Sequence, residues 1–145
     1  FAAGQAGERF AVRNSGALTV VEGCGDNGCE YMTGGVAVIL GGVGDNFAAG
    51  MSGGMAYVWD DAGVLEGHLN PDFVIIQRVE VDHYVQELKN LVVEHLWQTQ
   101  SALAERIVRD FDRELPRFWQ VVPKELLDKL PVPVTAAEAT AALTA

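Results

Sequence analysis

The first candidate for a functional site is the stretch 23–28. Its sequence, GCGDNG, has the G-x-G-x-x-G spacing of a dinucleotide-binding turn. In that motif a helix follows the glycines, and its N-terminus binds a pyrophosphate. Here the chain continues to a further glycine pair, Gly34-Gly35, where the helix should begin. The context therefore favours glycines that turn the backbone rather than a nucleotide site.

Cysteines and histidines could bind a metal, but their spacing does not favour it. Cys24 and Cys29 are the only cysteines, and a zinc site needs about four donors at characteristic spacing. His68, His83 and His95 are scattered, and the last two lie nearly on one face of a predicted helix, which packing explains as well as catalysis does. We interpret the two thiols as buried or half-buried packing groups.

Three carboxylates, Asp60, Asp61 and Glu66, cluster around Gly63. A solvated loop explains this cluster better than an acid/base pair does. The sequence also lacks a nucleophile elbow, a P-loop and a paired catalytic histidine and acid. We therefore assign no catalytic, cofactor-binding or metal-binding residue, and the pattern favours a scaffold or interaction domain over an enzyme.

Composition limits the partners and the compartment. The chain has 145 residues, 49% of them hydrophobic, which is typical of one folded domain. Its net charge of −10 and pI near 4.6 predict no nucleic-acid partner and no binding to anionic membranes. No apolar run reaches the roughly 18 residues of a membrane helix. Two cysteines favour a reducing, cytoplasmic setting, and a chain that begins at Phe1 is expected to be part of a longer protein.

A repeat of 19 residues organises the first half of the chain. Gly4, Gly23 and Gly42 share one repeat position, and the pairs Gly34-Gly35 and Gly53-Gly54 share another. We expect such glycines to occupy corners where the backbone turns or approaches a neighbour closely. The glycines assigned this structural role are Gly16, Gly23, Gly25, Gly28, Gly34, Gly35, Gly42, Gly44, Gly53 and Gly54.

Each repeat carries a short β-rich apolar run, at 17–21, 36–40 and 55–59. Runs of this length, bounded by glycine, predict parallel strands, and 19 residues are too few for a strand-helix-strand crossover. The repeat therefore predicts a mainly β fold with about three coils of a single-stranded parallel β-helix. The expected interior side chains are Leu18, Val20, Ala37, Ile39, Ala56 and Val58, whereas Tyr57 and Trp59 need another layer over them.

The pattern changes after Pro71 to a helical period, which predicts helices around 84–96 and 103–111. Thr99 or Ser101 can cap the second helix, and Pro123 opens a further short one. We therefore divide the chain into β-helix coils over 1–67, a C-terminal α-helical extension over 71–131 and a flexible tail over 132–145.

Distinctive motifs occur in three stretches of the sequence, at 7–17, 20–35 and 46–58. They include the segments GERFAVRNSGA, CEYMTGG and GMSGG. They resemble the C-terminal glycine-repeat (GXGXG) domain of the large (alpha) subunit of glutamate synthase. The second half is similar to that family as well, for example at 104–107 (AERI) and 115–118 (LPRF). The region after Pro131 is unmatched.

The resemblance implies a right-handed β-helix, of which this chain is the C-terminal part, in an oxidoreductase that makes two glutamates from glutamine and 2-oxoglutarate. It implies a structural role, with an amidotransferase domain and an FMN-binding synthase domain as partners. FMN and a 3Fe-4S cluster belong to the parent enzyme elsewhere, and none of their ligands has a counterpart here. A further expectation is that the isolated chain self-associates through the region around Phe1 to Val12, or that this region is poorly ordered, because the first coil has no coil before it.

An alternative is a stand-alone interaction subunit of another oxidoreductase, because a subunit of formylmethanofuran dehydrogenase carries a similar glycine-repeat domain. The sequence leaves open whether the parent enzyme takes electrons from NAD(P)H or from ferredoxin.

Overall fold

Five strands form one open sheet in the computed structural model, which describes residues 1–135. The strands are β1 Ser15–Val21, β2 Thr33–Ile39, β3 Gly53–Trp59, β4 Val74–Arg78 and β5 Phe118–Pro123, in the spatial order β1-β2-β3-β5-β4. β1, β2 and β3 are parallel, whereas β5 runs antiparallel to both β3 and β4. The sheet is therefore mixed.

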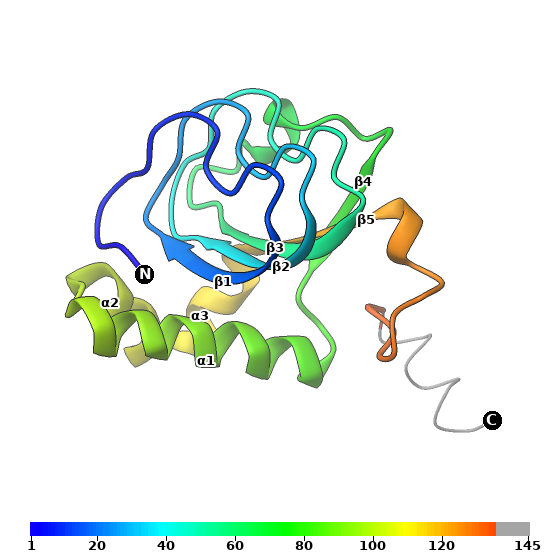
Figure 1. The fold of residues 1–145 in the computed structure, drawn as a ribbon. Helices are drawn as coiled ribbons and strands as arrows, with labels where there is room; N and C mark the ends of the chain where they lie inside the picture. The colour runs from blue at the N-terminus through cyan, green and yellow to red at the C-terminus, as the bar shows by residue number, and fades with distance from the viewer. Residues whose placement is uncertain (136–145) are drawn as a thin grey trace, which may run out of the picture.

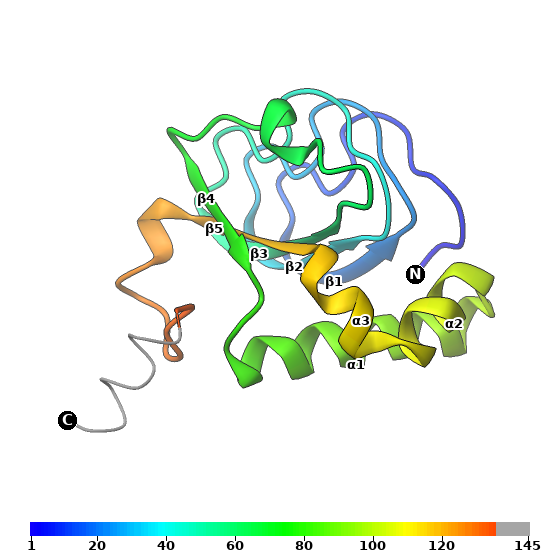
Figure 2. The same ribbon diagram turned by 180° about the vertical axis from the view of Figure 1, so that it is seen from behind.

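Helices cover one face of this sheet and long loops cover the other (Figure 1, and from behind in Figure 2). The helices are α1 Asp82–Thr99, α2 Ala102–Arg109 and α3 Phe111–Glu114, with short 3-10 turns η1 Leu65–His68, η2 Leu115–Arg117 and η3 Lys124–Leu126. The core is split accordingly into two hydrophobic clusters. One joins Tyr57 and Trp59 to the helices, and the other fills the space under the loops around Phe47.

The predicted parallel β-helix is wrong. Each 19-residue repeat contributes a single strand, and its return path consists of turns in which no second strand forms, so no further sheet closes on the first. Beyond β3 the sheet is extended by two antiparallel strands from the second half of the chain. The observed fold is a five-stranded mixed open sheet with three helices among the described residues.

The expected interior face is correct for only four of the six residues. Ala37, Ile39, Ala56 and Val58 face the loop layer, but Val20 faces the helices and Leu18 is 57% exposed. A bulge between Ser15 and Leu18 shifts the register, so Val20 pairs with Val38 instead of the residue 19 positions on. A shift of one residue turns a side chain to the opposite face.

The two helices predicted after Pro71 are present as α1 and α2. They supply the layer that Tyr57 and Trp59 require, and Tyr57 donates its hydroxyl hydrogen to the Glu87 carboxylate at 2.8 Å. The strands β4 and β5 were not predicted. Of the predicted tail, residues 136–145 lie outside the described residues, and in the part that is described Val134 is buried.

The face assignment makes a direct prediction for two apolar residues of β1 and β2. Ile39→Ala should lower the free energy of unfolding by about 2–5 kcal/mol, because Ile39 is fully buried. Leu18→Ala should change it by less than about 0.5 kcal/mol, because that side chain is exposed. Urea unfolding of both variants measures this, and equal losses would contradict the observed register.

Candidate functional site

The G-x-G-x-x-G stretch lies in the turns between β1 and β2, and no helix follows it before β2 begins at Thr33. Its glycines face other parts of the chain. A β-carbon on Gly25 would lie 3.0 Å from the amide nitrogen of Glu8, and one on Gly28 would lie 2.9 Å from the Cys24 sulfur. The stretch therefore lacks the helix N-terminus that a pyrophosphate needs.

The glycine pairs lie where neighbouring strands begin and approach each other most closely. A β-carbon on Gly34 would lie 2.6 Å from the Ser15 carbonyl oxygen, and one on Gly54 would lie 2.8 Å from the Gly34 carbonyl carbon. Gly35 and Gly54 also have φ values of +82° and +76°. Backbone packing disfavours a side chain at both glycine pairs, and backbone conformation adds to this at Gly35 and Gly54. By contrast, Gly16 and Gly42 face open space.

The loops carry a second repeated feature that the sequence reasoning missed. In each repeat the φ angle is positive at every other residue of a five-residue stretch, at 9–13, 27–31 and 46–50. The residues with positive φ are Arg9, Ala11, Arg13, Asn27, Cys29, Tyr31, Asn46, Ala48 and Gly50. Asparagine and glycine tolerate this conformation best, so Asn27 and Asn46 at matching repeat positions were the available signal.

Backbone hydrogen bonds stack these three stretches on one another. The amide of Asn27 donates to the Asp45 carbonyl at 2.8 Å, and the amide of Ala48 donates to the Gly28 carbonyl at 2.8 Å. The same pattern joins the first stretch to the second, where the amide of Arg9 donates to the Asp26 carbonyl at 2.8 Å. The loop layer is thus a hydrogen-bonded stack rather than a set of free loops.

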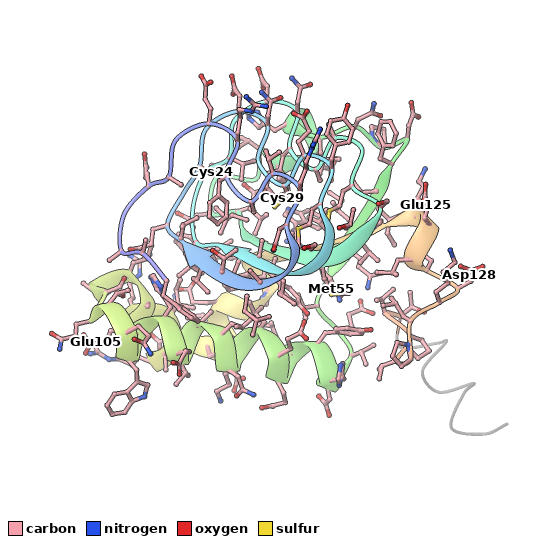
Figure 3. All side chains as sticks on the ribbon, viewed as in Figure 1. Cys24, Cys29, Met55, Glu105, Glu125 and Asp128 are labelled. Carbon is pink, nitrogen blue, oxygen red and sulfur yellow. The ribbon has the colours of Figure 1, made fainter. Side chains whose placement is uncertain are left out.

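Both cysteines lie in this loop layer (Figure 3). Burial raises the pKa of the Cys24 thiol to about 11, although a hydrogen bond from the Gly44 backbone acts in the opposite direction. Burial, and to a lesser extent the nearby Cys24, also raises the pKa of Cys29, which is fully buried. Both groups are neutral thiols at physiological pH, which suits packing and disfavours metal binding or nucleophilic attack.

The three carboxylates that follow β3 each make different contacts and do not form a pair. Asp60 accepts hydrogen bonds from the amides of Val64 and Leu65, both at 3.0 Å, and from the Trp119 indole at 3.1 Å. Burial acts to raise the pKa of Asp60, but these hydrogen bonds outweigh it and hold the pKa below its usual value. Asp61 pairs with Arg117 at 2.7 Å.

Glu66 lines a surface hollow of about 430 Å³ with apolar residues and Lys124. No acid/base pair results from the three carboxylates.

The three histidines lie in different places. His68 Nδ1 is 2.9 Å from an Asp45 carboxylate oxygen on the loop layer, and the His83 ring lies edge-on to Tyr84 at the start of α1. His95 is buried under the sheet. Within residues 1–135, no three His, Cys, Asp or Glu side chains lie close enough together to hold a metal ion.

A polar cluster that the sequence did not reveal joins the sheet to the helices, with His95 and Ser101 buried and Glu22 partly buried. Glu22 follows β1, and its carboxylate accepts hydrogen bonds from the Ser101 hydroxyl at 3.0 Å and from the Gly4 amide at 2.9 Å. The Nε2 atom of His95 lies 3.3 Å from the same carboxylate. At this distance an Nε2–H group can donate to the carboxylate oxygen. We call Glu22, His95 and Ser101 the Glu22 cluster.

The Glu22 cluster has the residue types of a hydrolytic triad but not its arrangement. In a triad the histidine lies between the acid and the nucleophile. Here Ser101 and His95 both bind the acid, and the Ser101 oxygen also caps α2 by accepting from the Ala104 amide at 3.1 Å. His95 Nδ1 is buried without a partner in the described part of the chain. The cluster is arranged to hold the α1–α2 corner against the sheet.

Comparisons with known proteins relate this chain to a small part of much longer polypeptides. A family model described as GXGXG motif matches residues 1–124. The chain is 64% identical to the glutamate synthase (NADPH) large chain of Azospirillum brasilense over 142 residues, which are 98% of this chain and 9% of that protein.

Further relatives are the chloroplastic ferredoxin-dependent glutamate synthase of Spinacia oleracea and the glutamate synthase (NADH) of Schizosaccharomyces pombe, each 54% identical. These matches cover 85% and 86% of this chain but 8% and 6% of those proteins. The chain thus spans about a tenth or less of each relative. Within its described residues, no helix combines the length and apolar content needed to cross a bilayer.

The close backbone contacts at the glycine pairs lead to a prediction. It distinguishes the cost of a steric clash from the cost of a positive φ angle. Gly63→Ala should cost about 1–2 kcal/mol of unfolding free energy, because its φ is +70° but the space around it is open. Gly35→Ala and Gly54→Ala should cost about 1–3 kcal/mol more, because the new β-carbon also meets backbone. Equal thermal midpoints for the three variants would rule out the tight corner.

The Glu22 cluster makes a second prediction. Ser101→Ala removes both the cap of α2 and a hydrogen bond to Glu22, so the free energy of unfolding should fall by about 1–2 kcal/mol. Ser15→Ala is the matched control at an exposed position and should cost less than about 0.5 kcal/mol. Denaturant titrations compare the two, and an unchanged midpoint for Ser101→Ala would show that the corner is held by packing alone.

Proposed function

The chain belongs to the GXGXG motif family, and on that premise we propose that it is a non-catalytic scaffolding domain of a glutamate synthase. The observation that carries the proposal is 64% identity to a glutamate synthase large chain over 98% of this chain. The parent enzyme would convert glutamine and 2-oxoglutarate to two glutamates with electrons from a reductant.

The side chains of this domain support a structural role. Asp60 accepts hydrogen bonds from a loop, His68 pairs with Asp45 on the loop layer, and His95 lies against Glu22 under the sheet. The Cys29 thiol is fully buried. The stacked loops on one face and the helices on the other give the sheet two covered faces (Figures 1 and 2). A body of this kind suits the spacing and support of neighbouring domains.

The cofactors of the proposed parent enzyme do not fit this chain. Iron-sulfur clusters are held by several cysteine thiolates, four in the common types. The chain has two cysteines, both with raised pKa, and one of them is fully buried. FMN carries a phosphate, and the G-x-G-x-x-G stretch offers no helix N-terminus for it. We therefore assign FMN and the 3Fe-4S cluster to other parts of the parent enzyme.

We propose the amidotransferase domain and the FMN-binding synthase domain of the same enzyme as the partners of this domain, and the cytoplasm as its compartment. The domain limits 1–67 and 71–131 remain proposals as well. Self-association through the stretch 1–12 also stays a proposal. The position of β1 supports this proposal, because β1 is at the edge of the described sheet and pairs there with β2 alone. Sedimentation of the purified chain tests it.

The proposed function predicts a division of activity between this domain and its parent polypeptide. The full polypeptide that contains the chain should form glutamate from glutamine and 2-oxoglutarate, and its visible spectrum should show flavin. The 145-residue chain by itself should be colourless and inactive, and NADH should not quench its tryptophan fluorescence saturably. Stoichiometric flavin or iron-sulfur absorption in the purified chain would contradict the scaffolding role, and a full polypeptide without synthase activity would contradict the assignment to glutamate synthase.

A further inference from the structure

Trp97 is the most exposed large apolar side chain among the described residues. It lies on the outer face of α1 with 78% of its surface exposed, whereas Trp59 is 7% exposed. Tryptophan is on average one of the more buried residue types, and at interfaces it is one of the side chains that contribute most to binding energy. A tryptophan left in solvent therefore indicates a contact surface.

A hollow lies next to this side chain. Leu96, Trp97, Gln100 and Glu105 line a surface depression of about 310 Å³ at the corner between α1 and α2. Gln100 ends α1 in a left-handed conformation with φ of 55°, and Ser101 caps α2 directly after it. Because the Glu22 cluster holds Ser101 from the inside, the corner is rigid, and a rigid surface binds at a lower entropic cost.

The chemistry around the hollow favours a cation. Glu105 lines it and projects from α2 at one end of the helical layer (Figure 3), and Glu94 precedes Trp97 by three residues on the outer face of α1. Glu105 pairs with Arg109 at 2.7 Å, but both side chains are more than half exposed, so a partner can exchange with Arg109 at little cost. The chain as a whole carries a net charge of −10.

Each of the other two tryptophans has an arginine side chain close to its ring. The Arg78 guanidinium lies 3.6 Å from the centre of the Trp119 ring, and the Arg106 guanidinium lies 5.5 Å from the centre of the Trp59 ring. Over residues 1–135 no basic side chain lies in this way over Trp97. An indole face flanked by carboxylates matches a guanidinium, which can stack on the ring and pair with an acid at the same time.

We propose that the hollow at Trp97 binds an arginine-bearing segment from another part of the same polypeptide. This inference rests on the proposed function. In one glutamate synthase relative the matched segment is 9% of the protein, so in such an enzyme most of the polypeptide lies outside this domain. The arginine lies over the indole of Trp97, pairs with Glu105 and covers the apolar surface of Leu96.

Hydroxyl-radical labelling of the full polypeptide, read by mass spectrometry, tests this proposal. Trp97 should be labelled as slowly as the buried Trp59. Glu105→Lys should raise the labelling rate of Trp97 about tenfold, because it repels the arginine. Glu66→Lys is the matched control, since it reverses another exposed carboxylate, in η1 on the loop side of the sheet, and should leave the rate unchanged.

Three outcomes would overturn the proposal. Labelling of Trp97 at the rate of the unfolded chain would mean that nothing covers it. Protection that Glu105→Lys does not change would exclude a basic partner. Protection that disappears on dilution would assign the surface to a second copy of the polypeptide.

Glutamate formation by the same preparation tests the proposed function separately. An active enzyme with an unprotected Trp97 would reject this inference alone, whereas a protected Trp97 in a polypeptide without synthase activity would reject the proposed function.

Discussion

The close approach of backbone to backbone at the glycine pairs sets the geometry of the first three strands. Hydrogen-bonded strands lie about 4.8 Å apart, and at Gly34 and Gly53 the next strand begins directly over the carbonyl groups of the strand before it. A side chain at either position would push β2 or β3 out of register. Both hydrophobic clusters depend on this register, because it decides which side chains face the helices and which face the loops.

The loop stack and the Glu22 cluster extend this constraint to the rest of the molecule. Hydrogen bonds between the stretches 9–13, 27–31 and 46–50 keep the loops in step with the strands, and they offset the cost of non-glycine residues at positive φ. On the other face, Glu22 binds Ser101 and His95 and so fixes the helical layer to the end of β1. Hydrogen bonds therefore join the sheet to the helical layer and link the loops to one another.

A body built in this way suits a supporting role. Its reactive residue types are used for internal hydrogen bonds, as at Asp60, or lie buried as neutral thiols, as at Cys29. The groups that it leaves available lie on the outside, where Trp97 and Glu105 flank a hollow at a rigid corner. The proposed scaffolding role and the proposed contact at Trp97 both rest on this arrangement.

The sequence by itself determined the 19-residue repeat, the three strands of the first half and the helices α1 and α2, because glycine spacing and hydrophobic period are local properties. It also led to the correct family through contiguous motifs. Only the tertiary structure decided that the repeats form a single sheet completed by β4 and β5, that a bulge turns Val20 to the helices, and that Glu22 meets His95 and Ser101. These features depend on contacts between residues far apart in the chain: Glu22 and Ser101 are 79 positions apart, and no local pattern encodes such a pairing.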